Sequence, residues 1–258
     1  MKVAILQPNP TAGDISGAMA QIDVALAAAS KQGAQMLVAP ELMLPGYHCP
    51  DVHRAAAQDQ SGEWMVTLAA MARHYRCGLT IGWAERDDGD CIYNAACVFD
   101  TDGCVIAHHR KCILFGEMEK SVFQRGAGDP HVFDFCGRRL GILICYEIEF
   151  PEPARALARC GADAILVPTA NPIGYDEVQD ILIPARACEN ALSVVYANFC
   201  GTENGLTYGG RSIVVGPNGK PLAQAGLCPT LIVADLPPVK RGTLAPQITD
   251  YDQAYRQK

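Results

Sequence analysis

Hydrophobic and polar residues follow two periods along this chain, one typical of helices and one typical of buried strands. Residues 18–40 show an Ala-rich helical pattern that runs into the apolar segment GAQMLVAP, and residues 151–168 show a second one that runs into GADAILVP. A further helical pattern follows each copy, over residues 64–76 and 183–191. The same helix-then-strand unit therefore occurs twice, unless helix–strand joints merely look alike.

Strand-like runs come after these helices and are separated by turn signals. They cover residues 78–85, 92–103 and 104–111 in the first half and residues 192–199, 208–219 and 220–226 in the second. Asp-Gly at 102–103 and Pro-Asn-Gly at 217–219 predict hairpin turns. Helices alternating with strands, some of them in hairpins, predict an α/β layered fold with a mixed sheet. Because no Pro-, Gly- or Ser-rich linker separates the halves, we expect residues 1–258 to form a single pseudo-symmetric domain.

The composition is that of a globular chain: 49 % of the 258 residues are apolar, 19 % are charged and the formal net charge is −7. Disordered and collagen-like chains are excluded, because nearly half of the residues can be buried. The lack of a Lys/Arg run argues against nucleic-acid or membrane-surface binding, and no apolar run approaches the roughly 20 residues that span a bilayer. We expect no nucleic-acid and no membrane partner, and a small or non-anionic ligand instead.

The twelve cysteines are unusual, and their even number invites a disulfide interpretation. The apolar N-terminal stretch is interrupted by Pro8 and Pro10 and is too short for a secretion signal, so we expect a cytoplasmic protein with reduced thiols. Zinc is not favoured either, since there is no Cys-x-x-Cys and the closest pair, Cys91 and Cys97, has five intervening residues. We expect most of the cysteines to be small buried hydrophobes, with no metal site.

Two residues at strand ends are candidates for chemistry. Cys145 follows the apolar run LGILI at 140–144 and precedes Pro151 and a helical pattern, so it lies at the carboxyl end of a strand, where α/β sheets place reactive groups. Glu41 follows MLVAP, where burial would raise its pKa toward neutrality and suit it for general base catalysis. The alternatives are a core cysteine and a solvated loop glutamate. Thr169 is the counterpart of Glu41 in the second repeat, so the repeat differs where chemistry is expected.

Lys111 ends a strand-like run and is followed by the apolar residues Ile113, Leu114 and Phe115. A buried ammonium needs a carboxylate neighbour, and Glu119, eight residues later, is able to supply it. An ordinary surface cation is the alternative interpretation of this lysine.

Three segments in this order, PELMLPGY at 40–47, RKCILFGEMEKSVFQRG at 110–126 and LGILICYEIEFPEPAR at 140–155, resemble the nitrilase superfamily of carbon–nitrogen hydrolases. The similarity extends over nearly the whole chain, including VPTAN at 167–171 and ARACENALSVVYANFCG at 185–201. It implies a four-layer αββα sandwich of two pseudo-symmetric halves, in agreement with the repeat above. It also implies an enzyme that needs neither a metal nor an organic cofactor and that forms a homodimer or a higher homo-oligomer.

The motifs of the superfamily place its catalytic residues on Glu41, Lys111 and Cys145, with Glu119 as an additional acidic residue beside the lysine. The resemblance implies that Cys145 attacks an amide carbonyl and forms a thioester. Glu41 would transfer the thiol proton to the leaving nitrogen and then activate water. Lys111 and the backbone N–H of Tyr146 would stabilise the oxyanion, and Glu119 would keep Lys111 charged and oriented.

The sequence differs from many relatives at two places. Cys112 and Ile113 stand where Thr-His often follows the lysine, which we expect to alter packing more than the reaction. Glu149 stands where enzymes for ω-amides of dicarboxylic acids carry an arginine, and a carboxylate there repels an acid and attracts an ammonium. A solvated or salt-bridged glutamate is the alternative. Phe-Gly-Glu after the lysine and Ile-Glu-Phe-Pro-Glu after the nucleophile are most similar to 5-aminopentanamidases.

We therefore expect hydrolysis of a short aliphatic monoamide, with ω-amino amides included, to the carboxylic acid and ammonia. The partners are the small amide and water, and the residues that we expect to contact the substrate are Tyr47, Glu149, Asn171 and Tyr175. Among enzymes, hydrolysis of an N-carbamoyl amine by the same residues is the nearest alternative, and a true nitrilase is a weaker one. Outside enzymes, a cysteine-rich thiol- or metal-binding protein would account for the twelve cysteines without catalysis.

Overall fold

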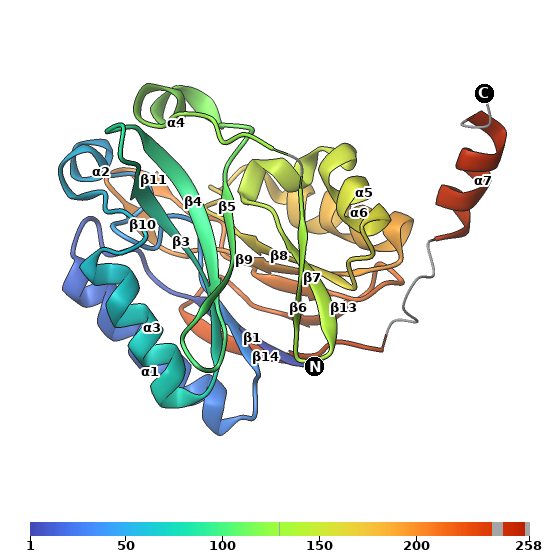
Figure 1. The fold of residues 1–258 in the computed structure, drawn as a ribbon, viewed down its shortest axis with the longest axis horizontal. Coiled ribbons are helices and arrows are strands. Elements are labelled where there is room, and N and C mark those ends of the chain that lie inside the picture. The colour runs from blue at the N-terminus through green and yellow to red at the C-terminus, as the bar shows by residue number, and fades with distance from the viewer. Residues whose placement is uncertain (129, 239–244, 256–258) are drawn as a thin grey trace.

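Two six-stranded sheets face each other in the computed structural model, which describes residues 1–128, 130–238 and 245–255 (Figure 1). The helices are α1 (Ile15–Lys31), α2 (Pro50–Ala56), α3 (Glu63–Tyr75), α4 (Gly116–Val122), α5 (Pro151–Arg159), α6 (Ile183–Asn190) and α7 (Pro246–Tyr255), with short helical turns η1 (Cys145–Glu149) and η2 (Val178–Leu182). The strands are β1 (Lys2–Gln7), β2 (Met36–Val38), β3 (Gly78–Arg86), β4 (Ile92–Phe99), β5 (Val105–Arg110), β6 (Val132–Phe135), β7 (Arg138–Ile142), β8 (Ala164–Pro168), β9 (Ser193–Ala197), β10 (Thr202–Glu203), β11 (Leu206–Thr207), β12 (Ile213–Val215), β13 (Pro221–Gln224) and β14 (Thr230–Asp235).

The two sheets have the same topology. The first has the order β14-β1-β2-β3-β4-β5 and the second β6-β7-β8-β9-β12-β13. In each sheet the central three strands are parallel, and antiparallel strands continue the sheet on both sides. The predicted repeat is therefore confirmed, since β2 and β8 occupy equivalent central positions. The halves are also interlocked, because β14 from the C-terminal half completes the sheet that β1 belongs to.

The layers follow from how each strand divides its side chains. Val3 and Ile5 of β1 point into the apolar layer between the sheets, whereas Ala4 and Leu6 point to the layer under α1 and α3. A third apolar cluster joins the outer face of the second sheet to α5 and α6. Figure 1 shows helices on the outer sides of the two facing sheets. Three apolar clusters fill the spaces between these four layers, and the expected αββα sandwich is confirmed.

Local sequence signals explain where several helices begin. The Asp14 side chain accepts a hydrogen bond from the Gly17 N–H and caps α1. Pro151 occupies the first turn of α5, where a missing N–H costs nothing.

In the C-terminal helix α7, Ile248 is buried against the second sheet's outer layer, and Asp252 pairs with Arg159 of α5. These contacts attach α7 to the outer side of the second sheet.

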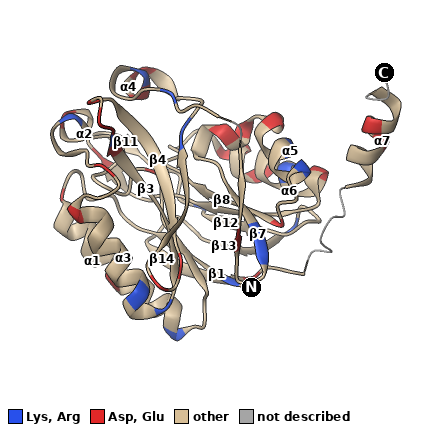
Figure 2. Cartoon of the chain, in the orientation of Figure 1, with Lys and Arg blue, Asp and Glu red and all other residues tan. Residues whose placement is uncertain are grey.

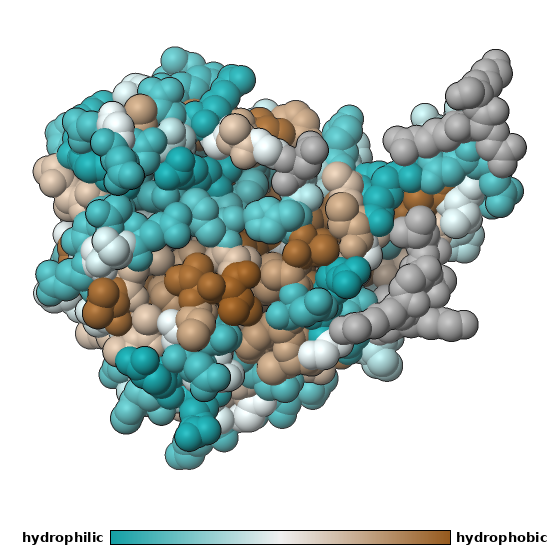
Figure 3. All heavy atoms as spheres, in the orientation of Figure 1, coloured by the Kyte–Doolittle hydropathy of each residue, from teal (hydrophilic) through white to brown (hydrophobic). Residues whose placement is uncertain are grey.

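The surface carries mixed charge. Figure 2 shows acidic and basic residues interspersed over the helices and loops, and Figure 3 shows hydrophobic residues gathered in the middle of the same face, over β5 and β6. Across the described residues, no helix combines the length and the apolar character that crossing a membrane requires.

The cysteines are distributed differently from the expectation. All twelve lie within the described residues and all are free. The prediction that most are buried is wrong, because only five are buried, two are partly exposed and five are exposed. The buried ones are Cys49, Cys77, Cys97, Cys145 and Cys200. Apolar neighbours in sequence did not distinguish an inward-facing from an outward-facing thiol.

A close backbone approach fixes the loop that follows β2. Gly82 of β3 donates its N–H to the Pro40 carbonyl oxygen at 3.2 Å, and a Cβ atom at Gly82 would lie 2.5 Å from Leu42 N and 2.7 Å from Glu41 Cα. Only glycine lets these two segments come this close. The candidate base Glu41 therefore depends on a glycine in the neighbouring strand for its position.

We expect Gly82→Ala to push the Glu41 loop away from β3 and to destabilise the fold by about 1–3 kcal/mol, the usual cost of overpacking. Urea unfolding measures this loss. Gly226→Ala is the matched control, since a Cβ atom there meets nothing within 4 Å. Equal stability of G82A and G226A would contradict the close-approach argument.

Candidate active site

A lysine lies between two glutamates in the interior. Lys111 Nζ donates hydrogen bonds to Glu41 Oε1 at 2.6 Å and to Glu119 Oε1 at 2.7 Å. All three side chains are completely buried. Three of the residues predicted from sequence are thus brought together, and the interpretations of Glu41 as a solvated loop residue and of Lys111 as a surface cation are wrong.

The two carboxylates are oriented by further hydrogen bonds. The Asn94 amide of β4 donates to Glu41 Oε1 at 2.7 Å, whereas Glu41 Oε2 is buried without a hydrogen-bond partner among the described residues. Glu119 belongs to α4 and accepts from the Tyr47 hydroxyl at 2.8 Å and from the Phe115 N–H at 3.0 Å. One oxygen of Glu41 thus remains available for a proton.

Cys145 begins the turn η1 just after β7, as the position at a strand end predicted. Its φ of +48° lies in the left-handed region, which residues other than glycine rarely adopt. The side chain is 7 % exposed, and it interacts electrostatically with Glu41 and Lys111. Cys145 is therefore nearly buried and lies within electrostatic reach of Glu41 and Lys111.

Burial sets the protonation of this group. It raises the pKa of Glu41 to about 7, although Lys111 acts in the opposite direction. Burial alone would lower the pKa of Lys111, but the two carboxylates more than offset this and the pKa is raised. Burial, followed by the charge of Glu41, raises the pKa of the Cys145 thiol well above its usual value. At neutral pH the group holds a protonated thiol, a charged lysine and a carboxyl near its midpoint.

The residues that we expect to contact the substrate differ in the protein groups that they already bond to. The Tyr47 hydroxyl is engaged by Glu119, and the Asn171 amide donates to the Tyr175 carbonyl oxygen and to Gln179, both at 3.2 Å. The Tyr175 ring is 39 % exposed and contacts Phe115 edge to face. Tyr47 and Asn171 thus already bond to protein groups, while Tyr175 has an accessible ring, and the contact of these residues with a substrate stays a prediction.

Tyr146 and Glu149 belong to η1 together with Cys145. The Tyr146 ring packs between Phe115 and Phe150, with centroid distances of 5.2 and 5.0 Å. No hydrogen bond to the Glu149 carboxylate is found among the described residues. Burial and the charge of Glu177 raise its pKa to about 7. Lys111 and Arg186 act in the opposite direction. A half-buried carboxylate without a hydrogen-bond partner among the described residues is therefore present near the candidate nucleophile.

Two polar residues of the site were missed in the sequence. Asn94 orients Glu41, and Glu147 is buried and accepts hydrogen bonds from His109 and from two backbone N–H groups. Asn94 interrupts an apolar strand pattern, which was the signal that could have found it. Glu147 follows Cys145 by two residues, but nothing in its neighbourhood distinguishes it from an exposed glutamate.

One group of side chains has the composition of a metal site. Ligand atoms of His109, Cys112 and Glu147 lie within 4.8 Å of one another. Both Glu147 oxygens, however, already accept hydrogen bonds, at 2.7 Å from the Cys112 N–H and at 2.8 Å from the Ile144 N–H and from His109. A metal ion would have to displace these bonds, so the arrangement fits a hydrogen-bonded carboxylate better than a metal ligand.

Comparison with known proteins identifies the family. Residues 2–245 match the family model of the carbon–nitrogen hydrolases. The chain belongs to the carbon–nitrogen hydrolase family. This hydrolase is therefore a member of the nitrilase superfamily, as its motifs indicated, and the interpretation as a thiol- or metal-binding protein without catalysis is not supported.

Several relatives of the hydrolase are similar over most of their length. It is 41 % identical over 238 residues to a hydrolase encoded in the pqqF 5′ region of Pseudomonas protegens, covering 92 % of this chain and 82 % of the relative. It is 33 % identical over 227 residues to an (R)-stereoselective amidase of a Pseudomonas species, covering 88 % and 81 %. The crystal structure of an amidase from a Nesterenkonia species superimposes with a TM-score of 0.88 at 39 % identity, covering 92 % and 90 %.

We expect Lys111→Met to destabilise the hydrolase by about 3–5 kcal/mol near pH 8, because Glu41 loses its cation while it stays buried. The pKa of Glu41 would then rise further. A carboxyl with a raised pKa in the folded state stabilises the protein at low pH and loses that contribution as the pH rises, so the deficit should shrink near pH 5. Urea unfolding at both pH values tests this.

Lys120→Met is the control for this substitution, since the one ion pair that Lys120 makes with a described residue is an exposed pair with Glu117. It should lose less than about 1 kcal/mol at either pH. A pH-independent deficit in K111M would refute the assignment of a buried carboxyl near its midpoint.

Proposed function

We propose that this hydrolase is an amidase that converts short aliphatic monoamides to the carboxylic acid and ammonia through a thioester on Cys145. The observation that carries the proposal is the buried lysine held between Glu41 and Glu119 beside a cysteine. Amide hydrolysis needs a nucleophile, an acid for the leaving nitrogen and a base for water, and this group contains all three functions. No metal or organic cofactor is needed for these steps.

Glu41 would carry the proton throughout the reaction. The thiol is protonated at rest because its pKa is high, so the sulfur attacks the carbonyl carbon as its proton moves to Glu41, whose Oε2 lacks a partner among the described residues. The C–N bond then breaks, and Glu41 gives that proton to the departing ammonia. Glu41 next takes a proton from water, which attacks the thioester and releases the acid and the thiol. A pKa of about 7 suits both directions of transfer.

The oxyanion would be stabilised from two sides. Lys111 keeps its charge beside the cysteine, and Tyr146 lies in the first turn of η1, where backbone N–H groups have no intrahelical acceptor. Each donor of this kind contributes roughly 3–4 kcal/mol in related chemistry. Glu119, held by Tyr47, would keep the ammonium in place.

Relatives support the nucleophile and the substrate class. In a solved structure of a mutant of the Nesterenkonia amidase, 39 % identical to this chain, acrylamide has added to the active site cysteine by Michael addition. Relatives named as amidases also include a 2-oxoglutaramate amidase from Bacillus subtilis, which is 28 % identical over 195 residues. The cytoplasmic location and the homo-oligomeric assembly stay predictions.

We further propose that an ω-amino group on the substrate binds at Glu149. This carboxylate has no hydrogen-bond partner among the described residues, and it interacts electrostatically with Glu177 of the segment after Tyr175. The two neighbouring carboxylates favour a cation over an acid, and the raised pKa shows that burial and Glu177 outweigh the opposing charges of Lys111 and Arg186. Arg186 fixes the local backbone by donating to the carbonyl oxygens of Ile148 and Glu149, so the carboxylate is attached to a rigid turn.

An ammonia-release assay across aliphatic amides, N-carbamoyl amines and nitriles tests the reaction. We expect ammonia release from aliphatic amides. The variant Cys145→Ala should release no ammonia and should unfold at the same temperature as the native protein. Failure to release ammonia from every aliphatic amide, or turnover by C145A, would defeat the proposal. Preference for carbamoyl amines would favour the ureido alternative.

The pH dependence tests the amino-group site. As Glu149 loses its proton around pH 7, the ratio of kcat/KM for 5-aminopentanamide to that for pentanamide should rise by roughly 10-fold. Glu149→Gln should remove this rise, whereas Glu152→Gln, at an exposed position on α5, should keep it. An unchanged ratio in E149Q would show that the amino group binds elsewhere.

A further inference from the structure

Glu147 has no role in the proposed reaction, yet its side chain bonds to the backbone next to Lys111 and to the backbone next to Cys145. Its side chain is 2 % exposed. Oε1 accepts the Cys112 N–H at 2.7 Å, and Oε2 accepts the Ile144 N–H at 2.8 Å and His109 Nε2 at 2.8 Å. One buried carboxylate thus receives three hydrogen bonds from two separate segments.

The donors are adjacent to the candidate catalytic residues. Ile144 immediately precedes Cys145, and Cys112 immediately follows Lys111. Because each peptide unit is rigid, fixing these N–H groups restricts the backbone at both residues. Lys111 follows β5 of the first sheet and Cys145 follows β7 of the second, so Glu147 joins the two sheets at the point where the site is assembled.

The bond to Ile144 also supports the conformation of the cysteine. Cys145 has a φ of +48°, and the Glu147 side chain closes the turn by returning to the N–H of the residue that precedes the cysteine. Unusual backbone conformations persist only where surrounding contacts hold them. Glu147 supplies such a contact within the turn itself.

The carboxylate keeps its charge despite its burial. Burial by itself favours the neutral acid, but the hydrogen bonds from His109, Ile144 and Cys112 more than offset it and lower the pKa of Glu147. Bonds to an ionised acceptor are shorter and stronger than bonds to a neutral one. His109 therefore helps Glu147 to act as a charged acceptor for two backbone groups.

We propose that Glu147 is a positioning residue that sets the placement of the Cys145 thiol relative to the Lys111 ammonium, acting through the backbone N–H groups of Ile144 and Cys112. The inference rests on the proposed roles of Cys145 and Lys111. It requires that weakening these bonds slow the reactions of the thiol even when the protein stays folded.

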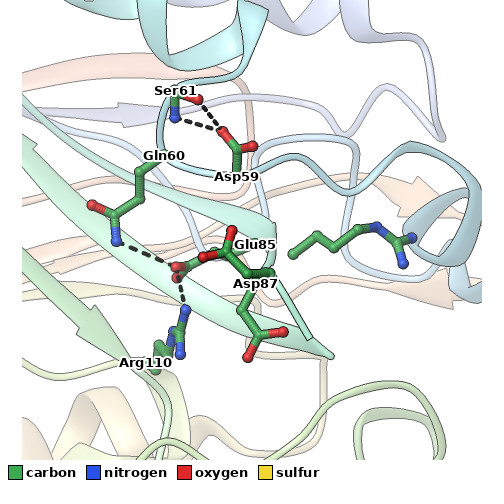
Figure 4. A pocket seen from close by; sticks show the side chains of 8 residues that line it. Asp59, Gln60, Ser61, Glu85, Asp87 and Arg110 are labelled. Carbon is green, nitrogen blue, oxygen red and sulfur yellow. Dashed lines mark hydrogen bonds and ion pairs between the residues drawn. The ribbon is translucent and has the colours of Figure 1, made fainter. Parts of the chain in front are cut away.

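The same strand provides a matched control. His108, next to His109 on β5, bonds to Glu85 on the other face at 2.6 Å, and Arg110 donates to Glu85 at 2.7 Å. Figure 4 shows Gln60 and Arg110 converging on Glu85 at the edge of a pocket of about 310 Å³. Glu85 is also 2 % exposed, but its hydrogen bonds come from side chains and none comes from the backbone beside Cys145.

The test compares Glu147→Gln with Glu85→Gln. Three quantities are measured: the melting temperature, the rate of Cys145 alkylation by iodoacetamide across pH, mapped by peptide mass spectrometry, and kcat and KM for an aliphatic amide. We expect E147Q to fold, to alkylate at Cys145 roughly 10- to 100-fold more slowly and to lose kcat by a similar factor with a smaller change in KM. E85Q should melt at a lower temperature while both rates stay within about twofold of the native values.

A folded E147Q with native alkylation and kcat would overturn the proposal, and so would an equal loss of both rates in E85Q. If E147Q does not fold, His109→Phe takes its place, since it removes one donor and leaves the backbone bonds to Glu147. It should slow alkylation by a smaller factor than expected for E147Q, and a native rate would count against the proposal. Alkylation needs no substrate, so the result is informative even if no amide is hydrolysed.

Discussion

The buried ammonium of Lys111, placed between the carboxylates of Glu41 and Glu119, is the interaction on which the arrangement of this protein depends. Removing three charges from water is costly, and the cost is offset only when each is closely paired and hydrogen-bonded. The surrounding structure meets this requirement with Asn94, Tyr47 and backbone N–H groups. Glu41 is the exception, because its Oε2 has no hydrogen-bond partner among the described residues and its pKa is raised to about 7, so this carboxyl is able to gain and lose a proton near neutral pH.

The internal repeat explains how such a group arises in a symmetric framework. Glu41 and Thr169 occupy equivalent positions after the central strands, and the Glu41 N–H donates to the Thr169 carbonyl oxygen at 3.3 Å, so the two ends meet. One repeat contributes an acid there. The other contributes a hydroxyl that hydrogen-bonds to Cys145 and lowers the pKa of its thiol, although burial outweighs this effect. The two halves of the sandwich thus have the same fold but carry different residues at the equivalent positions 41 and 169, which makes the candidate site asymmetric.

Periodicity was sufficient to predict an α/β layered fold with a repeated helix–strand unit, because each central strand is apolar on both faces and each covering helix has one apolar side. The four-layer arrangement followed from the resemblance to the nitrilase superfamily. The resemblance of its motifs to the nitrilase superfamily was sufficient to predict that Glu41, Lys111 and Glu119 meet. It did not reveal Asn94 or Glu147, since their partners lie 53 and 35 residues away in sequence and a polar residue in a strand or turn carries no mark of its partner. The prediction of cysteine burial failed for the same reason, because packing between distant segments decides whether each thiol is exposed.

The pairing of β1 with β14 bears on how the chain acquires its structure. Residues 2–7 form hydrogen bonds with residues 230–235, so β1 lacks its partner on this side until residues 230–235 have been synthesised. An open strand edge is a template for pairing with other chains. β1 therefore stays unpaired on one side until β14 is made, and the pairing of these two strands is a late folding event that moves the edge of the sheet from β1 to β14.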